Sequence, residues 1–112
     1  MEGQWDVSGL SASGAGGTFL GGLTLRSTSA SGFTGSYDVL ETSAQGQQRR
    51  VAGPVGGRMA GATTVEFDVT LGGSTRRHVA SVVGDSLRGS WFDVATAGSV
   101  ESSGSFRAIR KK

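Results

Sequence analysis

Aromatic residues that follow a glycine by two positions are the side chains of this sequence best suited to binding chemistry. Five such motifs recur: Gly3-Gln4-Trp5, Gly17-Thr18-Phe19, Gly35-Ser36-Tyr37, Gly89-Ser90-Trp91 and Gly104-Ser105-Phe106. Side chains on a strand alternate between two faces, so each glycine shares a face with its aromatic residue. A glycine there lets the strand bend and leaves room for a neighbouring ring, as closed sheets require. Gathered inside such a sheet, the rings would bury a small apolar ligand.

The predicted ligand-binding residues are inward-facing rings and two polar side chains among them: Trp5, Tyr37, Phe67, Ser81, Trp91 and Phe106. The Tyr37 hydroxyl would orient a ligand by a directional hydrogen bond. Ser81 would be a second polar group if its strand turns that face inward. The same rings could instead fill the interior, because an eight-stranded barrel is either packed or holds one small ligand.

Titratable side chains give little support for catalysis. Asp93, two residues after Trp91, could be a buried acid, although a solvated aspartate at a strand end is more common. His78 is the single histidine, and we expect it on the surface. The sequence has no cysteine, metal-ligand cluster, nucleophile elbow or phosphate loop. We therefore predict no catalytic residue, no metal and no cofactor, and leave enzymatic activity open.

Length and charge indicate one small soluble domain over residues 1–112, cytoplasmic or exported after removal of a signal. Much of the net charge of +2 comes from residues 107–112, interpreted as the end of the last strand and a solvated basic tail. Basic pairs without interleaved exposed aromatics make no stacking platform, so no nucleic-acid partner is expected. No apolar run approaches the roughly 18 residues of a membrane helix, and no membrane partner is expected.

Short alternating runs parted by Gly, Ser and Thr clusters predict an all-β fold. Eight strands are expected, at about 4–8, 18–26, 33–42, 49–60, 63–71, 76–83, 87–95 and 102–110. Pro54 has no N–H to donate, so the fourth strand should be bulged or interrupted there. The inward set of the sixth strand is ambiguous, being either Val79, Ser81 and Val83 or His78, Ala80 and Val82.

Short links between consecutive strands favour antiparallel hairpins and therefore a meander. Inward glycines at bend points, and the need to remove exposed edges, favour closure into an up-and-down barrel over a sandwich of two sheets. The outward positions carry polar and charged residues, which favours a soluble barrel over an outer-membrane one.

The order of motifs resembles the avidin/streptavidin family, within the wider group of up-and-down ligand-binding barrels that includes lipocalins. Gly3-Gln4-Trp5-Asp6-Val7 is similar to the family's first strand, and Phe33-Thr34-Gly35-Ser36-Tyr37 is similar to its third. Of the positions that grip biotin, Tyr37 is matched, whereas Val7, Val39 and Phe106 stand where polar residues are expected. The resemblance implies the architecture and possible side-by-side self-association, but it argues against tight biotin binding.

Three functions are compatible with these patterns. The first is a non-catalytic barrel that holds a small hydrophobic or aromatic ligand in its interior. The second is a packed barrel that acts as a protein-interaction or inhibitor module through its loops. The third is a small barrel enzyme of the cyclase or isomerase type that folds an apolar substrate in the cavity. A filled interior would favour the second function, and a cavity floored by Tyr37 the first or third.

Overall fold

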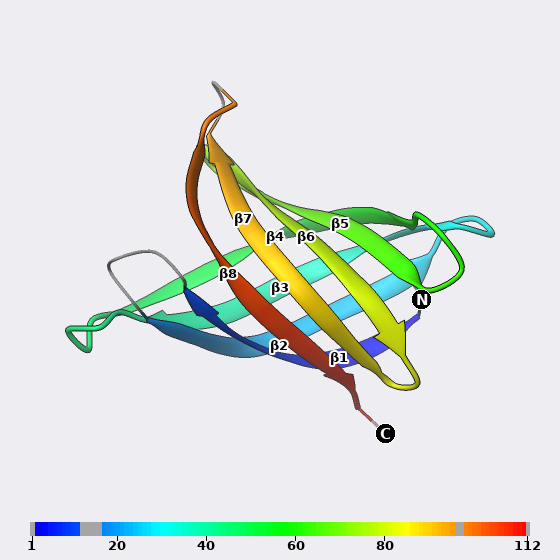
Figure 1. Cartoon of the computed structure of the whole chain (residues 1–112), viewed down its shortest axis with the longest axis horizontal. Coiled ribbons are helices and arrows are strands. Elements are labelled where there is room, and N and C mark those ends of the chain that lie inside the picture. Colours follow the sequence, from blue (N-terminus) through cyan, green and yellow to red (C-terminus); the bar gives the residue numbers. More distant parts are fainter. Residues whose placement is uncertain (1, 12–16, 96–97, 112) are drawn as a thin grey trace.

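The chain forms a closed barrel in which every strand pairs antiparallel with its neighbours in sequence and the last strand pairs with the first (Figure 1). This computed structural model describes residues 2–11, 17–95 and 98–111. The strands are β1 (Gly3–Ser11), β2 (Thr18–Ser27), β3 (Gly32–Thr42), β4 (Gln48–Met59), β5 (Thr64–Leu71), β6 (Ser74–Val83), β7 (Ser86–Ala95) and β8 (Val100–Arg110). The predicted all-β, eight-stranded antiparallel meander barrel is confirmed. The described residues include no helix long and apolar enough to cross a membrane.

Alternation along each strand turns one face into the core. On β5, Val65, Phe67 and Val69 are buried, while the residues between them are not. The same pattern brings the aromatic residues of the glycine motifs inside, at the positions Trp5, Phe19, Tyr37, Trp91 and Phe106. Burial of these rings supplies the main driving force for closure, because each removes a large apolar area from water.

Glycines allow neighbouring strands to approach each other closely. A Cβ atom on Gly35 would collide with the carbonyl oxygen of Thr24 on β2, and one on Gly89 with that of Val79 on β6. A Cβ atom on Gly104 would collide with the carbonyl oxygen of Leu10 on β1. These three glycines, each two positions before an aromatic, therefore mark places where the bent wall has no space for a side chain.

The fourth strand is not interrupted at Pro54, which corrects the prediction. Pro54 pairs with Ser36, and β4 runs on continuously along β3. The pairing between β4 and β5, however, begins only at Val55. Proline has no N–H to donate, which suits the position where that ladder stops. Residues 48–54 thus form a ladder with β3 alone among the described strands. The Thr70 backbone on β5 lies close to Gly53, so the unpaired edge of β4 is along residues 48–52.

The barrel is flattened, with principal extents of 41 × 33 × 20 Å. The ends of β3 and β4 reach to the left of Figure 1, and the ends of β7 and β8 reach to the top. Both chain termini lie at the opposite side of the molecule. The stagger between strands, which a closed sheet needs, produces these two projecting lips and opens a mouth between them.

Candidate functional site

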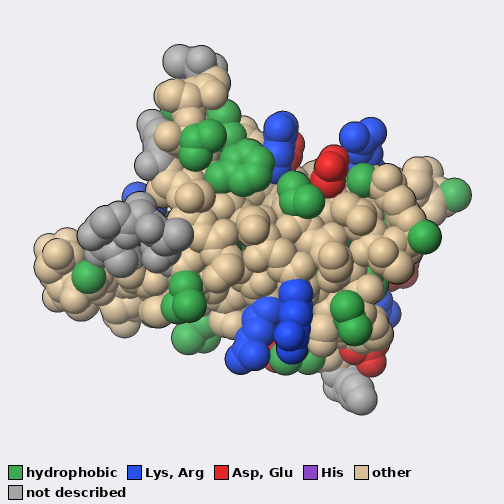
Figure 2. All heavy atoms as spheres, in the orientation of Figure 1, with side chains coloured by type: hydrophobic (Ala, Val, Ile, Leu, Met, Phe, Trp, Pro, Cys, Tyr) green, Lys and Arg blue, Asp and Glu red, His purple; other side chains and the backbone are tan. Residues whose placement is uncertain are grey.

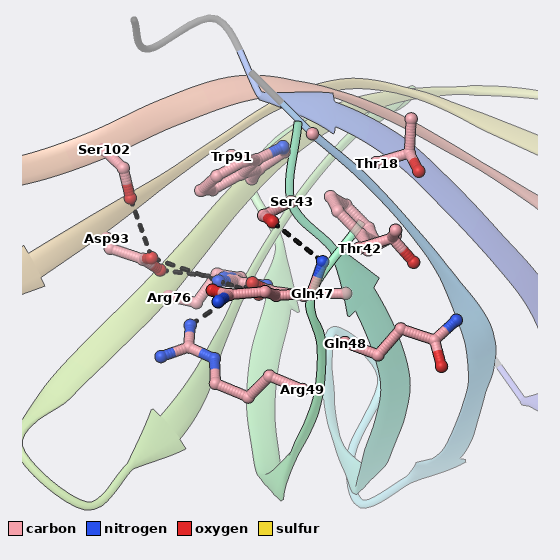
Figure 3. A pocket seen from close by; sticks show the side chains of 13 residues that line it. Thr18, Thr42, Ser43, Gln47, Gln48, Arg49, Arg76, Trp91, Asp93 and Ser102 are labelled. Atoms are coloured by element: carbon pink, nitrogen blue, oxygen red, sulfur yellow. Dashed lines mark hydrogen bonds and ion pairs between the residues drawn. The ribbon is translucent and has the colours of Figure 1, made fainter. Parts of the chain in front are cut away.

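A cleft of about 760 Å³ lies in this mouth. It is lined from β2, β3, β4, β6, β7 and β8 by Gly17, Thr18, Phe19, Glu41, Thr42, Ser43, Gln47, Gln48, Arg49, Arg76, Trp91, Asp93 and Ser102. Figure 3 shows polar side chains from the β3–β4 lip facing a group of charged and aromatic side chains on β6 and β7. The cleft therefore offers both space and chemically useful side chains.

A buried arginine forms the polar floor of the cleft. Arg76 is 1% exposed, and its Nε atom donates to Asp93 Oδ1 at 2.8 Å while Nη2 donates to Oδ2 at 3.1 Å. Nη2 also forms an ion pair with Glu41. Ser102 donates to Asp93 Oδ2 at 2.9 Å, and Arg49 donates to Glu41 at 3.2 Å (Figure 3). This network fixes the floor, because a bidentate arginine–carboxylate pair constrains both partners.

Two aromatic rings form the apolar wall beside the arginine. The Arg76 guanidinium lies 4.6 Å from the Trp91 ring centroid and 5.7 Å from that of Phe19. The two rings contact each other edge to face, with centroids 5.7 Å apart at 78°. Trp91 Nε1 donates to the Leu10 carbonyl at 3.2 Å, which fixes the indole. Stacking against the rings compensates part of the cost of burying the arginine.

Burial and the charges of this network shift the pKa values of Arg76 and of the neighbouring Tyr37. Burial alone would lower the pKa of Arg76, but the hydrogen bond to Asp93 and the nearby carboxylates raise it above its ordinary value. Burial raises the pKa of Tyr37 to about 12, opposed by the positive charge of Arg76. At neutral pH Arg76 is thus a permanent cation and Tyr37 a neutral phenol.

The centre of the barrel is filled by packed rings around a buried histidine. His78 stacks on Phe67 with centroids 4.3 Å apart at 9°, and it meets Phe106 and Tyr37 edge to face at 4.9 Å and 5.5 Å. The side chain is fully buried, so the predicted surface position of His78 is wrong. Burial, reinforced by the charge of Arg76, lowers the pKa of His78 to about 3. His78 is therefore a neutral core residue.

Several buried polar atoms in this interior have no hydrogen-bond partner of good geometry among the described residues: Tyr37 Oη, Trp5 Nε1 and both ring nitrogens of His78. Unpaired buried polar groups cost about 1–3 kcal/mol each and are uncommon in folded proteins. Polar neighbours are nevertheless close to two of these groups, namely Arg76 beside the Tyr37 hydroxyl and the Arg76 and Phe67 backbone beside His78.

The six predicted ligand-binding residues fall into four places. Trp91 lines the mouth cleft, whereas Tyr37, Phe67 and Phe106 pack around His78 in the centre. Trp5 lies on β1 opposite Arg110, the last residue of β8, whose guanidinium is 4.7 Å from the Trp5 ring centroid. Residues 107–110 form the end of β8, as expected for the last strand, and Arg107 and Ile109 on it are exposed.

Ser81 is exposed on the outer wall, which corrects its prediction as an inward polar group. Val83 and Ser86 pair across a two-residue turn, and this register sets Ser81 opposite Arg88, an outward residue. The other alternative for β6 is the correct one: His78 and Ala80 are buried, with Val82 partly so.

Arg76 and Glu41 belong to the site although no sequence motif indicated them, and Asp93 is not the solvated residue that its position suggested. Asp93 is 8% exposed and is held by Arg76 and Ser102. The sequence did contain a pattern that could have indicated this pair. A two-residue turn after Val83 sets a register in which Arg76 lies opposite Asp93, and opposite charges at such positions stabilise each other. Among the described residues, no group of three or more His, Cys, Asp or Glu side chains could hold a metal ion.

Among the solved structures similar in fold to this chain are two designed barrels that match it along almost its whole length. One is described as the de novo design of a fluorescence-activating β-barrel, with a TM-score of 0.68 and 16% identity over 99% of this chain and 94% of the other. The likeness shows the fold alone. The second is described as a redesigned β-barrel, mFAP1, bound to DFHBI, with a TM-score of 0.68 and 15% identity over 98% and 94% of the two chains. No family model and no curated protein matches the sequence.

Proposed function

We propose that this protein is a non-catalytic binding barrel that takes a small aromatic molecule into the mouth cleft. The observation that carries the proposal is the combination found there: about 760 Å³ of space, the rings of Trp91 and Phe19, and a fixed charged floor at Arg76. Ligand pockets usually occupy about 300–1,000 Å³ and combine apolar walls with a few polar groups. The rings would stack on the ligand, and the polar lip would hold its edge.

The charges around the cleft favour a neutral ligand. Arg76 and Arg49 balance Glu41 and Asp93, so these four side chains carry no net charge when all are ionised. A charged ligand would gain little attraction from such a floor and would lose its hydration. A neutral ring with hydrogen-bonding substituents would suit it better, because hydroxyl and amide side chains line the rest of the cleft.

The solved neighbours give independent support for a ligand of this kind. The mFAP1 structure, a barrel similar in fold, is bound to DFHBI, a small aromatic molecule. Biotin is a less suitable candidate than an aromatic ring. Tyr37 matches a biotin-binding position of the avidin family, yet its side chain packs in the filled centre.

Of the alternatives, the interaction module is favoured by one observation, which is the packed centre formed by Phe67, His78 and Phe106. A barrel with no deep cavity could act through its loops. An enzyme is less well supported. The carboxylate of Asp93 accepts hydrogen bonds from Arg76 and Ser102, which suits a structural anion better than a general acid or base.

Native mass spectrometry of protein purified from a rich lysate, followed by titration with DFHBI, tests the proposal. We expect a retained small molecule or saturable DFHBI binding that Trp91→Phe weakens about tenfold, consistent with loss of stacking area. Trp5→Phe is the matched control, because Trp5 lies beside Arg110 and outside the mouth cleft. Empty spectra together with no saturable binding of DFHBI or of a panel of neutral aromatics would reject the proposal in favour of the interaction module.

A further inference from the structure

A second concavity, of about 610 Å³, lies on the outer wall over β1, β2, β7 and β8. Its floor contains Phe19 and Phe106, and its sides carry outward-facing residues. In the register of the sheet, Phe106 lies between Gly9 on β1 and Gly89 on β7. Both glycines and Phe106 belong to the inward-facing set of their strands, so the outward residues that alternate with them border the concavity.

Two arginines border this groove without an acidic partner. Arg88 and Arg107 lie directly opposite each other in the β7–β8 ladder. Like charges at such positions destabilise a sheet. Among the described acidic side chains, none forms an ion pair with either arginine, whereas Arg50 and Arg77 on the outer wall each pair with an aspartate. The groove thus has an uncompensated double positive charge.

Aliphatic side chains occupy the other side of the groove. Leu10 is 57% exposed and Leu20 is 69% exposed, and both line the concavity. Figure 2 shows basic side chains gathered on this face of the barrel with hydrophobic side chains beside them. Exposed leucines scattered singly on a surface need no explanation, but two leucines in one hollow beside a pair of arginines form an amphiphilic surface.

We propose that this outer groove binds a soluble single-chain amphiphile with an anionic head group. The head lies between Arg88 and Arg107, where it relieves their repulsion and accepts charge-assisted hydrogen bonds. The chain lies along Leu10 and Leu20, which are thereby removed from water. The leucines line a hollow, which suits one enclosed chain better than a membrane surface. This site is distinct from the mouth cleft, with which it shares only Thr18 and Phe19.

Calorimetric titration with laurate, below its micelle concentration and at low salt, tests the proposal. We expect saturable binding that weakens up to about fivefold for Arg88→Gln and again for Arg107→Gln, the size expected of exposed ion pairs. Binding should fall as sodium chloride is raised from about 20 to 300 mM, because salt screens exposed charges. Arg50→Gln, which removes an exposed but paired arginine, is the matched control and should leave the affinity unchanged.

Three outcomes would overturn the proposal. The first is no laurate binding, or binding that is unaffected when both arginines are replaced. The second is equal affinity for dodecyltrimethylammonium, which carries the same chain and the opposite charge. The third is binding to vesicles of anionic phospholipid without binding to free laurate, which would mark the groove as a membrane contact. Trp91→Phe separates the two sites, since it should weaken DFHBI binding and leave laurate binding intact.

Discussion

At the scale of single residues, His78 shows how burial sets the protonation state of a side chain. A histidine on a strand between two arginines and a valine looks like a surface residue. Here it stacks on Phe67 in the barrel centre, and its pKa falls to about 3 from an ordinary 6.5. Between these two pH values the unfolded chain binds a proton that the folded chain excludes. Stability must therefore fall as the pH falls through this window.

We predict that the free energy of unfolding drops by about 2–3 kcal/mol between pH 7 and pH 4.5 on account of His78, since each pKa unit corresponds to about 1.4 kcal/mol. The variant His78→Leu should lose this component. Urea unfolding of both proteins at the two pH values measures the difference. An identical pH dependence in the two proteins would show that His78 is solvated in the folded state.

Arg76 and Arg77 are adjacent in sequence and opposite in environment. Arg76→Met would leave Asp93 and Glu41 without their buried counter-charge, and we expect a loss of about 3–5 kcal/mol. Arg77→Met removes an exposed ion pair with Asp68 and should cost less than about 1 kcal/mol. Chemical denaturation of the two variants provides the test. Equal losses would mean that the floor of the cleft is open to water.

The candidate site could be predicted from sequence only in part, and the reason lies in β6. Alternation alone cannot orient a strand whose two faces are Val79, Ser81 and Val83 or His78, Ala80 and Val82. The two-residue turn after Val83 resolves the choice through its register. The interior rings followed from the glycine motifs, whereas the cleft depends on how far the strands project at the mouth, which local patterns do not encode.

At the scale of the strands, glycine determines how tightly the wall can bend. The glycine motifs correctly indicated inward rings and closure, because a bent strand needs a position without a side chain next to a large ring. Gly89 illustrates the point: Phe106 is its partner on β8, and the Val79 carbonyl on β6 occupies the space where a Cβ atom would lie.

We predict that Gly89→Ala costs about 2–3 kcal/mol or more, as overpacking does in a tight interior. Gly56→Ala is the matched control: a Cβ atom there would meet nothing within 4 Å, and the change should stay within about 0.5 kcal/mol. Thermal unfolding followed by circular dichroism separates the two. Equal melting temperatures would contradict the close approach of β6 and β7.

At the scale of the whole molecule, closure depends on the ends of the chain. The ladder between β1 and β8 joins residues about a hundred positions apart, and the Arg110 guanidinium covers the Trp5 ring beside it. The number of strands and their meander order followed from the sequence, since short links admit few topologies. The flattened shape and the two lips did not, because they arise from the stagger of all the strands together.

Residues 48–52 of β4 pair with β3 but with no second strand among the described residues, so one edge of this segment is unpaired just before Pro54. We predict that Pro54→Val, which adds an N–H and a strand-forming side chain, promotes oligomers or fibrils that light scattering and thioflavin T fluorescence would detect. Ala52→Val, which retains Pro54, should remain monodisperse. If both variants assemble equally, the missing N–H is not what protects this edge. If Pro54→Val alone assembles, a single imino acid separates a dispersed barrel from a template on which further copies grow.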